Sequence, residues 1–190
     1  VGDKYSNFVK EGTSVYFNSE AGVIEGSAVT NKFGNATVTL LSGNPIPFDE
    51  VLKEGYFYVH STTVDEDEKY INTKTLVLFS STPVVTLSPT SIDIKNAGSQ
   101  NFSYTVSDIF GNPLAHGNNF AVVVETAGKA DASGDISITM PDRQFGVPTY
   151  FFTVFDKDVE NISLETISVR VISDGPNGRA TSNSATGLTR

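Results

Sequence analysis

A repeated turn motif constrains the fold of this chain more than any other feature of its sequence. The stretch Val106-Ser-Asp-Ile-Phe-Gly-Asn-Pro-Leu-Ala-His-Gly117 has a weaker copy at residues 1–12, Val-Gly-Asp-Lys-Tyr-Ser-Asn-Phe-Val-Lys-Glu-Gly. At an offset of 105 residues, the matched positions are Asp3 and Asp108, Tyr5 and Phe110, Asn7 and Asn112, Val9 and Leu114, and Gly12 and Gly117. In each copy a strand ends at the aspartate and the next residues turn the chain. Two copies one domain-length apart predict a tandem repeat.

Two further matches extend the repeat. Residues 33–40 (Phe-Gly-Asn-Ala-Thr-Val-Thr-Leu) align with residues 133–140 (Ser-Gly-Asp-Ile-Ser-Ile-Thr-Met) at an offset of 100, and Tyr56-Phe57 aligns with Tyr150-Phe151 at an offset of 94. Since loops change length more easily than strands, we expect the second copy to have shorter loops between the same strands.

Short apolar segments separated by Gly, Pro, Asn and Asp predict an all-β protein of two tandem Ig-like antiparallel β-sandwiches. Residues 35–41 show the alternation of a half-buried strand, and only a turn near residues 48–53 has helical character. In the first domain, strands are also predicted at residues 13–19, 27–30, 55–63 and 70–79. In the second, they are predicted at residues 84–87, 91–95, 101–107, 119–126, 135–140, 149–155 and 163–172.

The predicted domains are residues 1–82 and 83–173, followed by a polar linker or tail at 174–190. Residues 80–83 form the junction, stiffened by Pro83. About 22 residues, Val84 to Thr105, precede the turn of the second domain, and no such segment precedes the turn of the first. The first sandwich is therefore expected to lack its two leading strands and to expose a groove and unpaired sheet edges. Either the chain is a piece of a longer protein or another polypeptide supplies the missing strand by β-addition.

Charge and composition narrow the function classes. The net charge of −9 and the pI near 4.6 argue against nucleic acid and anionic membrane surfaces as partners. No apolar run approaches the roughly 20 residues that span a bilayer, so no membrane insertion is expected. The chain has no cysteine, which excludes disulfides, thiolate nucleophiles and cysteine-based zinc sites. Abundant Ser, Thr, Asn and Gly with few basic residues favour an extracellular or cell-surface location.

The only two histidines do not suggest catalysis. We expect His60 on a sheet face and His116 in solvent beside its turn. No His-x-x-His spacing and no nucleophile elbow accompany them, so the chain is predicted not to be an enzyme. No catalytic, cofactor-binding or metal-ligating residue is predicted.

Two acidic clusters, Asp65-Glu-Asp-Glu68 and Asp156-Lys-Asp158 with Glu160, are expected in corresponding loops between the last two strands of each domain. Grouped carboxylates could hold Ca²⁺, which takes six to eight oxygen ligands. The preferred interpretation is a solvated acidic turn that discourages edge-to-edge aggregation, because no Asp-x-Asp-x-Asp-Gly loop is present and Lys157 interrupts the second cluster.

Two aromatic strand segments, Tyr56-Phe-Tyr58 and Tyr150-Phe-Phe152, could form a sugar-stacking platform. Core packing is preferred, since alternation turns every second ring inward and the chain has no Trp. Asn35, Asn101 and Asn161 begin N-glycosylation sequons, which matter only in a glycosylating host.

The two turn motifs, together with Gly12-Thr-Ser-Val-Tyr-Phe17 and Thr30-Asn-Lys-Phe-Gly-Asn-Ala-Thr-Val-Thr-Leu40, resemble bacterial Ig-like modules of the Big-1, invasin/intimin type. The resemblance covers residues 1–80 and, less fully, 87–173. Ser6 and Phe8 depart from the family pattern, which has Gly and Pro there. The resemblance implies tandem modules in the stalk of a surface protein or adhesin.

The predicted function is therefore a non-enzymatic structural or stalk segment of an extracellular surface protein. One alternative is a filament subunit whose first domain is completed by a strand from a neighbouring chain, and another is a carbohydrate-binding or adhesive module. The expected partners are adjacent Ig-like modules of the same longer chain or neighbouring subunits.

Overall fold

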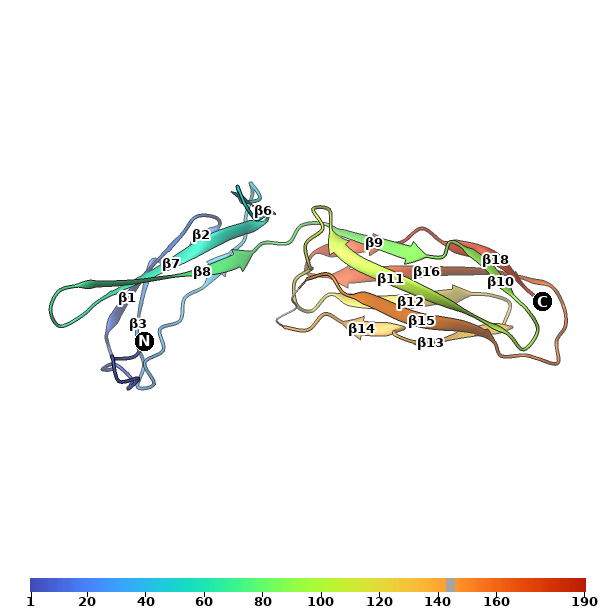
Figure 1. Cartoon of the computed structure of the whole chain (residues 1–190), viewed down its shortest axis with the longest axis horizontal. Helices are drawn as coiled ribbons and strands as arrows, with labels where there is room; N and C mark the ends of the chain where they lie inside the picture. Colours follow the sequence, from blue (N-terminus) through green and yellow to red (C-terminus); the bar gives the residue numbers. More distant parts are fainter. Residues whose placement is uncertain (143–145) are drawn as a thin grey trace. The chain divides into compact units, whose positions relative to one another are not determined.

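The computed structural model describes residues 1–142 and 146–190. They divide into two units, Val1–Phe79 and Ser80–Arg190, so the division falls three residues before the predicted boundary. The regular elements of the described residues are all β-strands, which confirms the all-β class (Figure 1). The described residues include no helical segment with the length and hydrophobicity of a transmembrane span.

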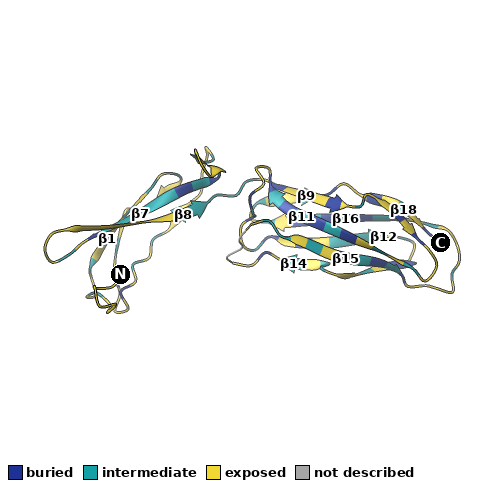
Figure 2. Cartoon of the chain, viewed as in Figure 1, coloured by how far each residue is buried: buried dark blue, intermediate teal, exposed yellow. Residues whose placement is uncertain are grey.

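Unit 2 is a β-sandwich. Its strands are β9 (Pro83–Ser88), β10 (Ser91–Ile94), β11 (Ser99–Asp108), β12 (Asn119–Glu125), β13 (Ala130–Gly134), β14 (Ser137–Thr139), β15 (Thr149–Asp156), β16 (Glu165–Gly175), β17 (Gly178–Thr181) and β18 (Ala185–Thr189). One sheet has the order β13-β15-β11-β9, and the other has the order β10-β18-β16-β12-β14, with β17 also paired to β16. All pairs are antiparallel except β10 with β18. Alternate residues of both sheets point into the shared core, as the two-residue period of a strand requires (Figure 2).

The prediction of a polar linker or tail at residues 174–190 is wrong. These residues complete β16 and form β17 and β18, and β18 is the only strand of unit 2 that pairs with β10 among the described residues. Hydrophobicity gave no signal because the inward positions are small or polar: Ala185 and Thr189 are fully buried. At Gly187 a Cβ atom would overlap the Ile92 carbonyl oxygen, so the close approach of β10 requires glycine.

Unit 1 has one complete sheet and a much smaller second layer. Its strands are β1 (Ser14–Ser19), β2 (Val23–Ile24), β3 (Ser27–Val29), β4 (Leu40–Leu41), β5 (Phe48–Asp49), β6 (Lys53–Glu54), β7 (Tyr56–Val64) and β8 (Tyr70–Leu78). The sheet has the order β3-β1-β7-β8, and β2-β4 and β5-β6 are separate two-stranded ribbons. The helical turn expected at residues 48–53 is instead the β5-β6 hairpin, in which Asp49 Oδ1 accepts the Val51 and Leu52 N–H groups, both at 2.8 Å.

Backbone hydrogen bonds show that the two units repeat one another. Strand β1 corresponds to β12, β2 to β13, β3 to β14, β4 to β15, β7 to β16 and β8 to β18. The matching N–H to O pairs are Gly12 to Thr30 (2.8 Å) and Gly117 to Met140 (3.1 Å), Phe17 to Gly26 and Val122 to Ile136 (both 2.9 Å), and Glu25 to Thr39 (3.2 Å) and Asp135 to Phe151 (2.9 Å). A side chain repeats too: Glu25 Oε2 accepts the Thr39 N–H at 2.7 Å, and Asp135 Oδ2 accepts the Phe151 N–H at 3.0 Å.

These pairs correct two of the sequence alignments. The offset grows from 105 residues at the turn motif to 110 at Thr30 and Met140, so the expected shortening of the second copy is wrong. Tyr56-Phe57 lies on β7, the counterpart of β16, whereas Tyr150-Phe151 lies on β15. Residues 133–140 likewise match residues around β3, not residues 33–40. Similar residue types on non-equivalent strands produced both errors.

Residues 1–79 contain no counterpart of β9, β10 or β11. The sequence predicted the absence of leading strands in this unit, but it predicted two where the comparison with unit 2 shows three. Its second layer consists of the β2-β4 ribbon, which corresponds to β13-β15. The predicted strand at residues 35–41 alternates between half-buried and exposed side chains, yet only Leu40–Leu41 joins a ladder. The rest of the segment has no neighbouring strand to pair with.

Candidate functional site

The repeated turn is held in the same way in both units. Asp108 Oδ1 accepts the Phe110 N–H (2.9 Å) and the Asn112 N–H (2.8 Å), and Asp3 Oδ1 accepts the Tyr5 N–H (2.8 Å) and the Asn7 N–H (2.9 Å). The second carboxylate oxygen accepts the side-chain amide of Asn112 (3.4 Å) or Asn7 (3.1 Å). The motif that suggested the repeat is therefore a side-chain-capped turn.

Two further copies of this turn lie in unit 1. Asn31 Oδ1 accepts the Phe33 N–H (2.9 Å) and the Asn35 N–H (3.1 Å), and Asp65 Oδ1 accepts the Asp67 N–H (2.9 Å) and the Lys69 N–H (2.8 Å). The acidic run at residues 65–68 thus forms a capped turn between β7 and β8.

The fourth residue of every copy has a positive φ. It is 66° at Ser6, 72° at Gly34, 63° at Glu68 and 83° at Gly111. A side chain is unfavourable in this conformation, so the two copies with glycine are the less strained ones.

The second acidic cluster does not occupy the corresponding loop, contrary to expectation. Asp156 ends β15 and its cluster precedes β16, whereas the Asp65 turn precedes the counterpart of β18. Asp156 is buried, and its carboxylate accepts the Ala97 N–H (2.9 Å) and the Asp158 N–H (3.0 Å). Lys157 pairs with Asp131 at 3.7 Å. Within the described residues, no group of three or more His, Asp or Glu side chains is arranged to hold a metal ion.

Both histidines contact protein groups. His60 lies on the outer face of the β3-β1-β7-β8 sheet, with its Nε2 3.0 Å from Glu20 Oε1. This hydrogen bond lowers the pKa of Glu20, with smaller contributions from the Tyr58 N–H and from Lys74. His116 is exposed beside its turn, as expected, and its Nδ1 lies 3.1 Å from the Met140 carbonyl oxygen.

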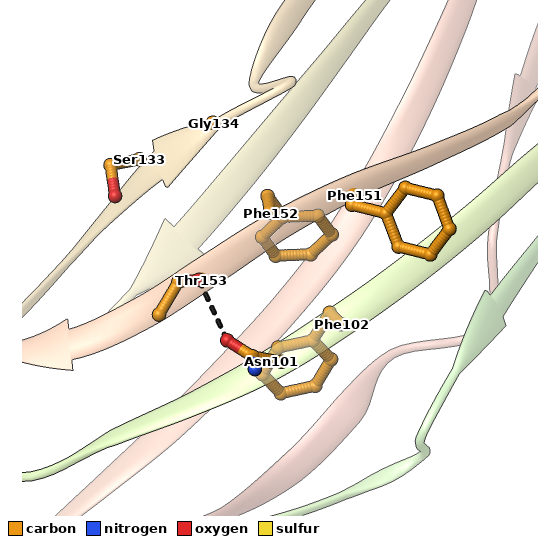
Figure 3. A pocket seen from close by; sticks show the side chains of 7 residues that line it. All are labelled: Asn101, Phe102, Ser133, Gly134, Phe151, Phe152 and Thr153. Carbon is orange, nitrogen blue, oxygen red and sulfur yellow. Dashed lines mark hydrogen bonds between the residues drawn. The ribbon is translucent and has the colours of Figure 1, made fainter.

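The aromatic segments alternate as predicted. Phe57 and Phe152 are buried, whereas Phe151 is 62% exposed. A shallow hollow beside Phe151 is lined by β11, β13 and β15, and Figure 3 shows Phe102 stacked on Phe152 while Phe151 points away from that pair. The stacked rings lie 5.2 Å apart, and the Thr153 hydroxyl donates to Asn101 Oδ1 at 2.8 Å. The hollow therefore offers one exposed ring beside polar side chains.

Of the three sequon asparagines, Asn101 lies on β11, an inner strand of its sheet, and Asn35 and Asn161 lie at turns. Asn35 and Asn101 are exposed, and Asn161 Oδ1 accepts the Ser163 N–H at 3.0 Å.

A polar cluster that the sequence did not reveal holds the first residues of unit 2 against two of its turns by hydrogen bonds. Asn177, in the β16-β17 turn, donates from its side-chain amide to the Ser80 carbonyl (3.0 Å) and the Ser81 carbonyl (2.8 Å), and its Oδ1 accepts the Ala115 N–H (2.9 Å). Asp108 Oδ2 accepts the Ser81 N–H at 3.0 Å. A single asparagine in a Gly-Pro-Asn-Gly segment gives no sequence signal beyond a turn.

No protein-family model matches the sequence, and no curated protein matches it either. Among solved structures, domains 4 and 5 of the S-layer protein SbsC match at a TM-score of 0.39 and 17% identity, covering 100% of this chain and 78% of that one. Fibronectin(III)-like modules of CbhA from Clostridium thermocellum match at 0.34 and 17% identity, covering 95% and 80%. The N-terminal domain of the Streptococcus gordonii adhesin Sgo0707 matches at 0.24 and 12% identity, covering 100% and 54%. These values are too low to carry an argument about function.

Proposed function

We propose that the chain is a non-enzymatic structural segment of an extracellular surface protein, with β-modules arranged in series as in a stalk. The observation that carries this proposal is the repetition of the capped turn and its flanking ladders, down to individual hydrogen bonds, in two units of one chain. Modules repeated in series lengthen a protein, and such a spacer needs no separate binding or catalytic site in each module.

The start of unit 2 supports the same function. Ser80 and Ser81 are bound by Asn177, and the Ile109 N–H donates to the Thr82 carbonyl at 3.0 Å. The segment that would transmit tension into unit 2 is therefore anchored to two of its loops. The resemblance to Big-1 modules, including their surface location, is part of this proposal.

Single-molecule stretching of the whole chain tests the mechanical part. We expect unit 2 to unfold in one step that releases several hundred ångströms of chain, given about 3.3–3.6 Å per extended residue. Asn177→Ala should lower the unfolding force, whereas Thr186→Ala, at an exposed position of β18, should not. Gradual extension with no discrete step would contradict a module that resists force.

Antibody labelling of intact source cells tests the location. Surface labelling that protease treatment of intact cells removes is the expected result. Labelling that appears only after the cells are broken would overturn the extracellular assignment.

An alternative proposal is a filament subunit whose first domain is completed by a strand from a neighbouring chain. Within residues 1–79, strand β4 pairs with β2 alone, whereas its counterpart β15 pairs with both β13 and β11. Ordered polymers of the purified chain, seen by electron microscopy, would favour that alternative.

A further inference from the structure

We propose that the outer face of the β13-β15-β11-β9 sheet carries a glycan-binding site centred on Phe151. Its ligand is a neutral oligosaccharide of β-linked, glucose-configured pyranose units. The site lies wholly within unit 2, and it does not depend on the structural role proposed for the chain.

The first observation is a single exposed aromatic ring on a sheet face that is otherwise polar. Phe151 is 62% exposed, and on the four strands of this sheet the only other exposed large hydrophobic residue is Val84. Val84 lies on β9, on the far side of β11 from β15. A surface that binds another protein presents a contiguous apolar patch, which this face lacks. One flat ring is suited instead to stacking against one sugar ring, whose axial C–H groups form an apolar face.

The second observation is a row of polar side chains beside this ring. Cross-strand pairing places Thr153 between Asn101 on β11 and Ser133 on β13. The Thr153 hydroxyl donates to Asn101 Oδ1 at 2.8 Å, which orients the amide (Figure 3). The Nδ2 group of Asn101 and the hydroxyl of Ser133 make no hydrogen bond to any described residue. These free donors and acceptors match the hydroxyl groups of a sugar.

The third observation is that the backbone around the ring is fixed and leaves a hollow. The Phe151 N–H donates to Asp135 Oδ2 at 3.0 Å, and the Phe151 carbonyl accepts the Asp135 N–H at 2.9 Å. A Cβ atom at Gly134 would lie 2.8 Å from the Phe151 carbonyl oxygen, so this position holds no side chain and the hollow stays open. The hollow has a volume of about 330 Å³, at the small end of the range for ligand sites. The ring is therefore held in place before a ligand arrives, which favours binding.

Charge and shape define the class of glycan. None of the described residues that line the hollow is charged, and Asp131 on β13 is paired with Lys157 at 3.7 Å. The net charge of −9 repels anionic polymers, so a neutral glycan fits better than an acidic one. In β-linked glucose units every hydroxyl is equatorial, which leaves both faces of the sugar ring apolar. An axial hydroxyl, as in mannose, makes one of these faces polar and weakens stacking on a phenylalanine ring.

The test uses the full chain and cellohexaose, a β-linked glucose hexasaccharide, followed by the NMR chemical shifts of the backbone amides. We expect saturable shifts at millimolar ligand, concentrated at residues 101–103, 133–135 and 151–153. Mannohexaose with the same β-1,4 linkage should bind more weakly, because each of its units carries an axial hydroxyl. Equal or stronger binding of mannohexaose would overturn the glucose configuration of the proposed ligand.

Variants of the ring locate the site and identify stacking as its mode of binding. Phe151→Leu should weaken cellohexaose binding about tenfold or more, because leucine is apolar but offers no flat ring, whereas Phe151→Trp should keep it. Asn101→Asp keeps the acceptor for the Thr153 hydroxyl but removes the Nδ2 donors, so it should weaken binding as well. Phe110→Ala is the matched control, since it removes another exposed phenylalanine of unit 2 that does not line the hollow.

Three results would overturn the proposal. One is the absence of saturable shifts with cellohexaose at millimolar concentration. Another is a set of shifts that lies outside the strands around Phe151. The third is a Phe151→Leu variant that binds cellohexaose as tightly as the unchanged chain, because the ring would then not stack on the sugar. The amide spectrum of each variant also shows whether unit 2 is folded, so loss of binding is distinguished from loss of structure.

Discussion

One side-chain oxygen caps the backbone of each repeated turn. The residue at the fourth position of the turn determines how strained its backbone is. Asp3, Asn31, Asp65 and Asp108 all cap two backbone N–H groups, so aspartate and asparagine are interchangeable in this role. Ser6 takes the positive φ that Gly111 takes in the other unit.

Ser6→Gly should stabilise unit 1 by about 1 kcal/mol, because a left-handed backbone is unfavourable for a residue with a Cβ atom. Gly111→Ser should destabilise unit 2 by a similar amount. Hydrogen exchange resolved by unit, in denaturant, measures both changes. If each variant were as stable as the unchanged chain, the positive φ at the fourth position would strain neither turn.

Strands could be predicted from the sequence where polar and apolar residues alternate regularly. A strand at residues 101–107 and the turn at Asp108 were both predicted, because polar and apolar residues alternate in that segment and the capping residue is explicit. Strand β18 was missed, since its buried positions are Ala185 and Thr189 and its contact with β10 depends on Gly187. Asn177 was missed because its role depends on Ser80 and Ser81, about 97 residues away.

The parallel pairing of β10 with β18 leads to a prediction about that element. Gly187→Ala should destabilise unit 2 by about 2 kcal/mol or more, because a Cβ atom there would overlap the Ile92 carbonyl oxygen, a backbone atom that cannot move alone. Thr186→Ala, at an exposed neighbouring position, should change stability by less than about 0.5 kcal/mol. Chemical denaturation followed by circular dichroism distinguishes the two. A mild effect of Gly187→Ala would mean that β10 is not held against β18.

At the scale of the whole molecule, three carboxylates of unit 1 should make the stability of that unit depend on acid. The pKa values of Asp3, Glu20 and Asp49, all in unit 1, lie below their usual range because each carboxylate accepts hydrogen bonds, led by those from Asn7, His60 and Leu52 respectively. A carboxyl group with a lowered folded-state pKa stabilises the fold above its unfolded pKa, about 4, and that contribution is lost as the pH falls through the folded value.

Unit 1 should therefore become less stable as the pH falls from about 5 to below 4, as measured by hydrogen exchange at several pH values. Asp3→Asn should reduce this dependence while keeping the turn, because Asn31 caps an equivalent turn. An unchanged pH profile in that variant would contradict the assignment to Asp3.

The placement of β17 and β18 in the sandwich determines which part of the molecule folds alone. Unit 2 as residues 80–190 should melt cooperatively, whereas residues 80–175 should not, because the truncation leaves β10 without its partner and removes the buried Ala185 and Thr189. It also removes Ser182, whose hydroxyl accepts the Val171 N–H at 2.9 Å. Thermal melting followed in the near ultraviolet compares the two, with Thr186→Ala in residues 80–190 as the control for a harmless change. If residues 80–175 melted cooperatively at an unchanged midpoint, residues 176–190 would be a tail that the sandwich does not need for its stability.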